Sequence, residues 1–349
     1  MHLYIHVPFC ESKCFYCSFT SLKKKDFEKN YLNALMQDIK YQLDFFKVAK
    51  NSIKTVFIGG GTPSLMDIHF YEKIFIFLQA YLKQECEITI EANPNSSNFS
   101  WLSAIKNLGF NRISFGAQSF HEKKLQFLGR IHDQKAIFKS IENAKKAGFD
   151  TINLDLIYDT KLDDTKMLDY EISKLALLDI DHVSAYNLTI EEKTRFAKKF
   201  HYKKNAPRLA KYFIKAIESL GYKQYEISNF GQICKHNLAY WQGKDYIGCG
   251  LSAVGFLKNQ RFYTKKNLKD YINDPCFREI ENLNLQDLRL EHIFLRLRSL
   301  IGIEETKLEP LEREKAMFLS KKGKLVYKKG VFYNTNYLLS DELALYIST

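Results

Sequence analysis

The chain carries three cysteines within eight residues, Cys10, Cys14 and Cys17, directly after an apolar run. Structural zinc normally takes four ligands, commonly as two C-x2-C pairs. No second pair exists, because the other cysteines stand singly, at Cys86, Cys234, Cys249 and Cys276. Three thiolates on one short loop suit a 4Fe-4S cluster whose fourth iron stays open to a small molecule. The spacing C-x3-C-x2-C therefore predicts a cluster ligated by Cys10, Cys14 and Cys17.

A run of three glycines, Gly59 to Gly61, follows the second apolar segment and continues as Thr62-Pro63-Ser64. Glycine lets backbone amides and carbonyls approach a ligand closely, because no Cβ intervenes. A tight turn needs the same residues. The glycine run by itself leaves both interpretations open.

Four polar residues follow or interrupt later apolar runs: Glu91, Gln118, Arg130 and Asp155. A carboxylate accepts hydrogen bonds from ammonium or hydroxyl groups, and an amide both donates and accepts them. The planar guanidinium of Arg130 could bind a carboxylate, whereas Asp155, within an apolar run, needs partners of its own. Each residue also has an ordinary interpretation, such as a helix cap or a surface charge.

A repeated strand–helix pattern positions these residues over the first two-thirds of the chain. The predicted strands cover residues 3–9, 55–58, 87–91, 112–115, 151–158 and 182–188. Six such units indicate a parallel sheet with helices outside, either an open doubly wound sheet or a barrel. An active site collected from the C-terminal ends of many strands is typical of a barrel. We therefore expect an α/β fold, with a partial (β/α)6 barrel over residues 1–230.

The pattern changes after residue 230. Residues 231–280, rich in glycine and aromatic residues, are expected to connect the barrel to a smaller C-terminal domain over residues 281–349. The elements predicted in that domain are helices over 287–300 and 304–319, hairpin strands over 325–327 and 331–333, and a short helix from Asp341. Helices followed by a β-hairpin indicate a winged-helix-like α+β module.

Composition narrows the class of protein. Of the 349 residues 46% are hydrophobic, enough for a sizeable core, and no run approaches the ~18 apolar residues of a membrane span. The N-terminus has no signal-peptide pattern, and seven cysteines do not form a disulfide framework, so we expect a cytoplasmic protein. The formal net charge of +12 is spread as lysines along predicted helix faces. We therefore expect no nucleic-acid partner.

The cysteine motif, with an aromatic residue before its last cysteine, resembles the hallmark of radical S-adenosylmethionine (SAM) proteins. Residues 3–10, LYIHVPFC, are similar to the branch that contains oxygen-independent coproporphyrinogen III oxidase and the heme chaperone HemW. In that family the open iron binds the amino and carboxylate groups of SAM. The resemblance implies a SAM site made of Tyr4, Gly60, Gly61, Thr62, Glu91, Gln118, Arg130 and Asp155.

A last motif, H-N-x-x-Y-W, comprises His236, Asn237, Tyr240 and Trp241. It resembles a signature of the chaperone branch that is linked there to heme binding. Imidazole is a common axial ligand of heme iron, and flat aromatic side chains suit a porphyrin face. The alternative is that the motif packs the barrel against the C-terminal domain.

Two functions from different classes fit this resemblance: a radical SAM decarboxylase of heme synthesis, and a protein that binds and delivers heme. The oxidase branch has a fourth cysteine two positions after the third and a long N-terminal extension. This chain has Phe19 at that position and only nine residues before Cys10. We therefore expect a heme chaperone with a 4Fe-4S cluster, SAM and heme as cofactors. Its partners would be heme and a heme-acceptor protein, with a homodimer and peripheral membrane contact left open.

Overall fold

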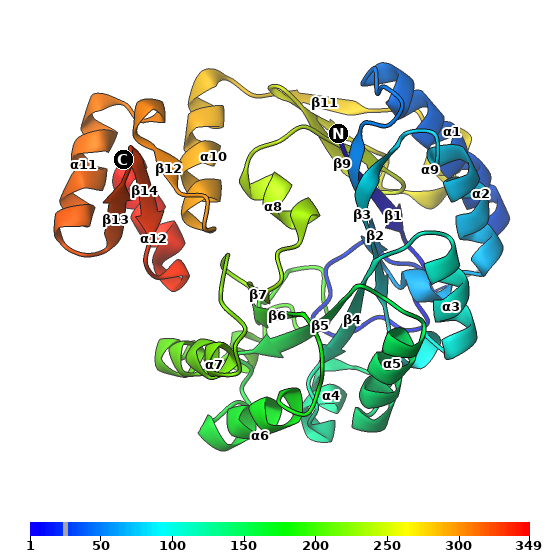
Figure 1. Ribbon diagram of the computed structural model, residues 1–349, viewed down its shortest axis with the longest axis horizontal. Helices are drawn as coiled ribbons and strands as arrows, with labels where there is room; N and C mark the ends of the chain where they lie inside the picture. Colours follow the sequence, from blue (N-terminus) through cyan, green and yellow to red (C-terminus); the bar gives the residue numbers. More distant parts are fainter. Residues whose placement is uncertain (24–26) are drawn as a thin grey trace.

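Residues 1–23 and 27–349 are described by the computed structural model of the chain (Figure 1). Six parallel strands, each followed by at least one helix, form the centre of a large sheet. The strands are β1 (His2–Val7), β2 (Ile53–Gly60), β3 (Leu82–Ala92), β4 (Arg112–Gln118), β5 (Thr151–Tyr158) and β6 (His182–Asn187). The helices that follow them are α1 (Glu28–Phe45), α2 (Ile68–Leu78), α3 (Phe99–Asn107), α4 (Glu122–Leu128), α5 (Gln134–Lys146), α6 (Thr165–Leu175) and α7 (Pro207–Ser219). The six strands pair in chain order, so the six expected strand–helix units are present.

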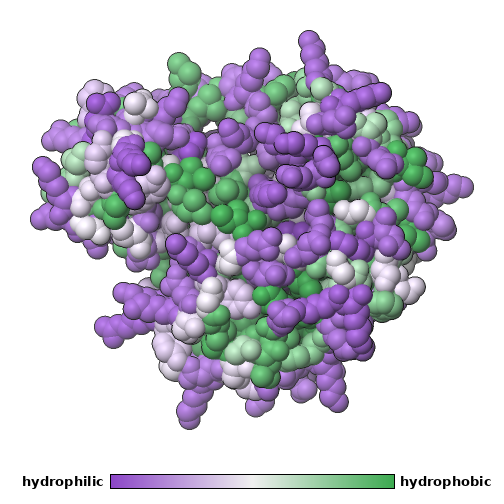
Figure 2. All heavy atoms as spheres, viewed as in Figure 1, coloured by the Kyte–Doolittle hydropathy of each residue, from purple (hydrophilic) through white to green (hydrophobic). Residues whose placement is uncertain are grey.

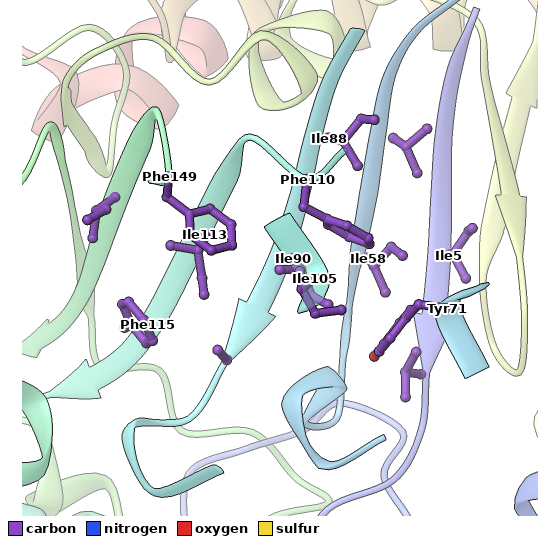
Figure 3. Close-up of a cluster of buried hydrophobic side chains, with 14 of the residues drawn as sticks. Ile5, Ile58, Tyr71, Ile88, Ile90, Ile105, Phe110, Ile113, Phe115 and Phe149 are labelled. Atoms are coloured by element: carbon purple, nitrogen blue, oxygen red, sulfur yellow. The ribbon is translucent and has the colours of Figure 1, made fainter. Parts of the chain in front are cut away.

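The two faces of these strands differ in polarity, because alternate residues of a strand point to opposite sides of the sheet. One face is apolar and packs under the outer helices. Figure 3 shows Ile5, Ile58, Ile90 and Ile113, from four neighbouring strands, in a cluster with Tyr71 of α2. The opposite face carries polar residues at neighbouring register positions, among them His2, Tyr4, His6, Thr55, Glu87, Glu91, Arg112, Ser114, Asn153, Asp155, His182 and Ser184.

Residues 231–280 were expected to connect two domains, and in the structure they also extend the large sheet. β8 (Tyr246–Cys249) pairs in parallel with β1. The remaining added strands are antiparallel: β9 (Val254–Leu257), β10 (Gln260–Tyr263), β11 (Glu279–Asn282) and, at the opposite edge, β7 (Asn229–Gly231). Among the described residues no pairing joins β7 to β11. The sheet stays open, and the expected α/β class with a partial barrel is confirmed.

Two short helices, α8 (Lys235–Trp241) and α9 (Leu268–Asn273), belong to this extension, and α8 lies between the barrel and the C-terminal module (Figure 1). The C-terminal module contains α10 (Leu285–Leu297), β12 (Ile303–Glu304), α11 (Pro310–Lys321), β13 (Leu325–Lys328), β14 (Val331–Asn334) and α12 (Ser340–Ser348). It has its own apolar core, which includes Ile293, Ala316 and Phe332.

The prediction of one helix over residues 304–319 is wrong for residues 304–309. Ile303 and Glu304 pair with β14, and a short 3-10 turn, Glu305–Lys307, follows. The α-helix begins at Pro310, where proline loses no helical hydrogen bond. Glu309 and Glu312 close a capping box at that end.

Candidate cofactor site

The cysteine loop is held over the C-terminal ends of the parallel strands. Its backbone bonds to three separate segments: Cys10 N donates to Leu22 O at 2.9 Å, Phe15 N to Leu128 O at 3.0 Å, and Phe196 N to Phe15 O at 3.1 Å. A Cβ added at Gly129 would lie 2.6 Å from the Phe15 ring, so glycine is needed for this close packing. All three cysteines of the loop remain half-buried free thiols.

A chain of side-chain hydrogen bonds joins two of these cysteines across the site. Thr62 Oγ1 lies 3.5 Å from Cys10 Sγ and accepts from Asn93 Nδ2 at 3.3 Å. Arg130 Nη2 donates to Asn93 Oδ1 at 2.5 Å, and Arg130 Nη1 lies 3.2 Å from Cys14 Sγ. The structure thus brings Thr62 and Arg130, which the sequence assigned to SAM, into contact with the cysteine loop. Sequence reasoning missed Asn93 as a site residue, although it stands at the end of the third predicted strand.

Gly60 and Glu91 meet at the ends of β2 and β3. Gly60 N donates to Glu91 Oε2 at 2.9 Å. Gly60 has φ +117°, and a Cβ there would lie 2.4 Å from the His6 ring, so only glycine fits. Burial and the nearby Asp155 carboxylate raise the pKa of Glu91 to about 7. Glu91 therefore lies where it could release a proton and accept an ammonium group near neutral pH.

Asp155 and Gln118 lie on the next two strands. Asp155 Oδ1 accepts from Asn153 Nδ2 at 2.7 Å and from Ser114 Oγ at 3.4 Å, and burial raises the pKa of its carboxyl group. Gln118 has φ +68°, and the register between β4 and β5 shifts beside it. Such an irregularity redirects a side chain at a strand end. Four strand ends in a row therefore contribute polar groups to one site.

The residues at this site fit an iron–sulfur cluster and an amino-acid ligand. In the part of the chain that the structure describes, no group of three His, Cys, Asp or Glu side chains is placed to hold one metal ion. A 4Fe-4S cluster has no such requirement, because each thiolate binds its own iron. Burial raises the pKa of Cys10 and of Cys17, and the Arg130 guanidinium lies beside Cys14 Sγ at 3.2 Å. Arg130 Nε is buried without a partner among the described residues, which leaves it a free donor.

The H-N-x-x-Y-W motif forms α8, whose first turn is buried against the polar face of the barrel. The Glu87 carboxylate accepts from Lys235 N and from His236 N, both at 2.9 Å. His236 Nδ1 bonds to Thr55 Oγ1 at 2.6 Å, and its Nε2 bonds to the Tyr240 hydroxyl at 2.8 Å. Burial lowers the pKa of His236 to about 3. The imidazole is neutral, and both of its nitrogens are engaged within the protein.

A cavity of about 880 Å³ lies beside α8. Residues of five regions line it: β1, the end of the cysteine loop, the end of α8 with the residues after it, the β8–β10 strands and α10. Tyr240 is on its wall, whereas His236, Asn237 and Trp241 are not among its lining residues. Trp241 Nε1 is buried without a hydrogen-bond partner among the described residues. The structure thus gives the four motif residues different surroundings, and of these four only Tyr240 lines this cavity.

Comparisons with known proteins agree with this geometry. The Radical SAM superfamily matches residues 4–170. The heme chaperone HemW of Bacillus subtilis is 33% identical over 324 residues, covering 87% of this chain and 85% of that protein. HemW of Haemophilus influenzae is 34% identical over 329 residues, covering 88% of this chain and 85% of that protein. Among solved structures, coproporphyrinogen III oxidase (HemN) from Escherichia coli superposes with a TM-score of 0.82 over 99% of this chain and 89% of that one, at 21% identity.

The family match over residues 4–170 and the cysteine motif define a radical SAM protein, a class that carries a 4Fe-4S cluster and SAM. The sequence identity is more specific, because it exceeds 30% over most of both chains. The chain belongs to the HemW family, and the resemblance seen in its motifs is confirmed. The likeness to HemN, at 21% identity, shows the shared fold alone.

Proposed function

We propose that this protein is a heme chaperone that binds heme and passes it to an acceptor protein. The observation that carries the proposal is the 33% identity with a HemW heme chaperone over 87% of the chain. Two features of the sequence support it: the H-N-x-x-Y-W motif on α8, and Phe19 in place of the fourth cysteine that is expected in the oxidase branch.

In this proposal Cys10, Cys14 and Cys17 hold the 4Fe-4S cluster. When bound, the cluster supplies an open iron for the amino and carboxylate groups of SAM. The role proposed for Arg130 is to hold the Cys14 side of the loop and to offer its free Nε to an anionic group. Glu91 would accept the ammonium group, beside the close-packed backbone of Gly60. The further residues proposed for SAM are Tyr4, Gly61, Thr62, Gln118 and Asp155.

The partners proposed are heme, through the segment His236–Trp241, and an acceptor protein. A homodimer and a peripheral membrane contact at the acceptor are compatible with this role. We place the protein in the cytoplasm, where a reducing environment keeps thiols such as its seven free cysteines from oxidising. None of the helices in the described ranges, 1–23 and 27–349, is long and apolar enough to cross a membrane.

A paired assay on anaerobically reconstituted protein tests the proposal. The first arm titrates ferric heme and follows the difference absorbance, then adds apomyoglobin and follows heme transfer. The second arm supplies coproporphyrinogen III, SAM and a reductant and measures decarboxylation. Heme binding and transfer without decarboxylation would support the chaperone. Efficient decarboxylation, or no heme uptake, would overturn it.

A further inference from the structure

We propose that heme is seated in the cavity beside α8, with Tyr240 as its iron-facing residue and His236 as a positioning residue behind Tyr240. This inference rests on the proposed function and goes further, because it specifies the wall, the charged groups and the iron contact of the heme site. Three independent features of the cavity support it.

The first feature is the apolar wall. Phe256 of β9 and Leu290 and Phe294 of α10 line the cavity, together with the ring of Tyr246. Figure 2 shows hydrophobic side chains gathered between the C-terminal module and the barrel, where α8 and α10 lie in Figure 1. A volume of about 880 Å³ is within the range of roughly 300–1,000 Å³ for pockets that bury a large organic ligand. The cavity suits a flat, largely apolar macrocycle.

The second feature is the positive charge around this wall. Lys244, Arg261 and Arg298 line the cavity, against a single carboxylate, Glu291. Arg261 is paired with Glu291 and with Glu281 at 3.3 Å, and Arg298 Nε donates to Asp341 at 2.9 Å.

Lys244 differs from the two arginines. It is exposed, and no carboxylate of a described residue forms an ion pair with it. A ligand with carboxylate groups on an apolar ring would therefore place a carboxylate at Lys244 with the least competition from the protein. Heme, with its two propionates, is such a ligand.

The third feature is the position of the motif residues. Tyr240 lines the cavity, whereas His236 is 1% exposed and reaches it only through the 2.8 Å hydrogen bond to the Tyr240 hydroxyl. Thr55 holds the other ring nitrogen of His236 at 2.6 Å, which fixes the plane of the imidazole. His236 can therefore accept the phenolic hydrogen while a lone pair of the Tyr240 oxygen remains for iron. Tyrosine is one of the axial ligands that proteins give to heme.

In this contact the Tyr240 oxygen donates an electron pair to ferric iron. Its phenolic proton would pass along the hydrogen bond to His236 Nε2, so that the oxygen binds iron as a phenolate, and no electron is transferred. A second tyrosine–histidine pair, Tyr4 with His6 at 3.0 Å, lies on the wall nearer the cysteine loop. We assign that pair to the SAM side, because Tyr4 belongs to the proposed SAM site and His6 Nε2 is bonded to Thr20 O, just beyond the cysteine loop.

The first test uses spectra of ferric heme bound to anaerobically reconstituted protein. Tyr240→Phe keeps the ring, and it should remove the resonance Raman bands of iron-bound tyrosine and weaken heme binding at least tenfold. Tyr246→Phe, a neighbour 4.5 Å away between ring centroids, and Tyr4→Phe should keep those bands. His236→Gln should shift the bands, since its amide still reaches toward Tyr240, and His236→Ala should shift them further. Bands that survive in Tyr240→Phe, or that vanish in Tyr4→Phe, would overturn the assignment.

The second test blocks the cavity. Leu290 is 43% exposed, so Leu290→Glu should fold normally while it places a negative charge against the ligand; we expect heme affinity to fall at least tenfold. Leu311→Glu, on α11 outside the cavity and 58% exposed, is the matched control and should bind heme as the parent protein does. Melting temperature and iron content are measured for each variant. If the parent protein binds no heme, the proposed function fails; if it binds heme and Leu290→Glu binds equally well, only the cavity assignment fails.

Discussion

Arg130 offers the sharpest test of the cofactor site, because it contacts the cysteine loop and the strand ends together. Its guanidinium donates to Asn93 Oδ1 and to Gly116 O, both at 2.5 Å, and lies 3.2 Å from Cys14 Sγ. From the sequence alone we expect Arg130→Ala to weaken SAM binding while iron content stays normal. Because Arg130 also contacts Cys14, we now expect Arg130→Ala to lower the iron content as well, since the loop that carries the cluster loses a hydrogen bond.

The size of the effect follows from the lost partners. Removing the side chain leaves two acceptors without a donor, at about 1–3 kcal/mol each when fully buried. The site is only half-buried and water can replace part of the loss, so we expect the unfolding free energy of the ligand-free protein to fall by about 2 kcal/mol. One lost charged hydrogen bond to SAM is worth about 1.5–3 kcal/mol, or roughly 10- to 150-fold in affinity. Arg130→Lys keeps the charge but not the planar fork, and should be intermediate.

Three measurements check this prediction: urea unfolding, SAM titration by calorimetry and iron per chain after reconstitution. Arg208→Ala is the control, since Arg208 is exposed on α7 and should change none of them. We expect Arg130→Ala to bind SAM more weakly and to retain less iron after desalting. Unchanged SAM affinity together with unchanged iron retention would refute the reasoning and leave Arg130 only the hydrogen bonds that it makes within the fold.

Three further predictions concern the same site. Cys17→Ala should abolish the 4Fe-4S chromophore, whereas Cys86→Ala, at a buried packing residue, should keep it; equal iron content in the two variants would contradict the ligand assignment. Gly60→Ala should cost at least about 2 kcal/mol of stability, from backbone strain at a positive φ and from steric overlap with the His6 ring. Gly148→Ala, at φ +81° with nothing within 4 Å, measures the backbone strain alone. Equal losses of stability in the two variants would exclude the overlap with His6. The pKa of Glu91 rises from 4.5 to about 7 on folding. Between these two pH values the ligand-free folded protein holds a proton that the unfolded chain has released, so its stability falls as the pH rises from about 4.5 to about 7. Glu91→Gln should flatten this dependence of stability on pH, and an unchanged dependence in thermal melts would argue against the raised pKa of Glu91.

Much of the site could be predicted from the sequence, because its residues follow predictable strands. Glu91, Gln118 and Asp155 each occur at or near the end of an apolar run, and parallel strands bring such ends to one edge of a sheet. The strand over residues 151–158 has the predicted bounds. The alternation of apolar and polar residues was enough to predict this strand, because one face of each strand packs against apolar helices and the other face carries the polar groups.

Contacts between distant segments could not be predicted in this way. β8 pairs with β1 although more than 200 residues separate them, and no local pattern marks that partner. Glu87 stands in a predicted strand, but its bonds to Lys235 N and His236 N depend on a helix that arrives much later in the chain. The burial of His236 could not be predicted either, because a histidine between polar residues has the same local sequence whether its ring faces solvent or the barrel.

The polar face of the barrel positions both proposed sites at once. Thr55 bonds to His236 near the beginning of β2, and Gly60 bonds to Glu91 at the end of the same strand. Five residues of strand separate them by about 17 Å, a distance that a fully paired strand cannot change. Coupling between SAM and heme would therefore pass through groups that border both sites, and Tyr4 and His6 on the cavity wall are such groups. A ligand in the cavity would contact α8 on one side and these β1 residues on the other, without any movement of the sheet.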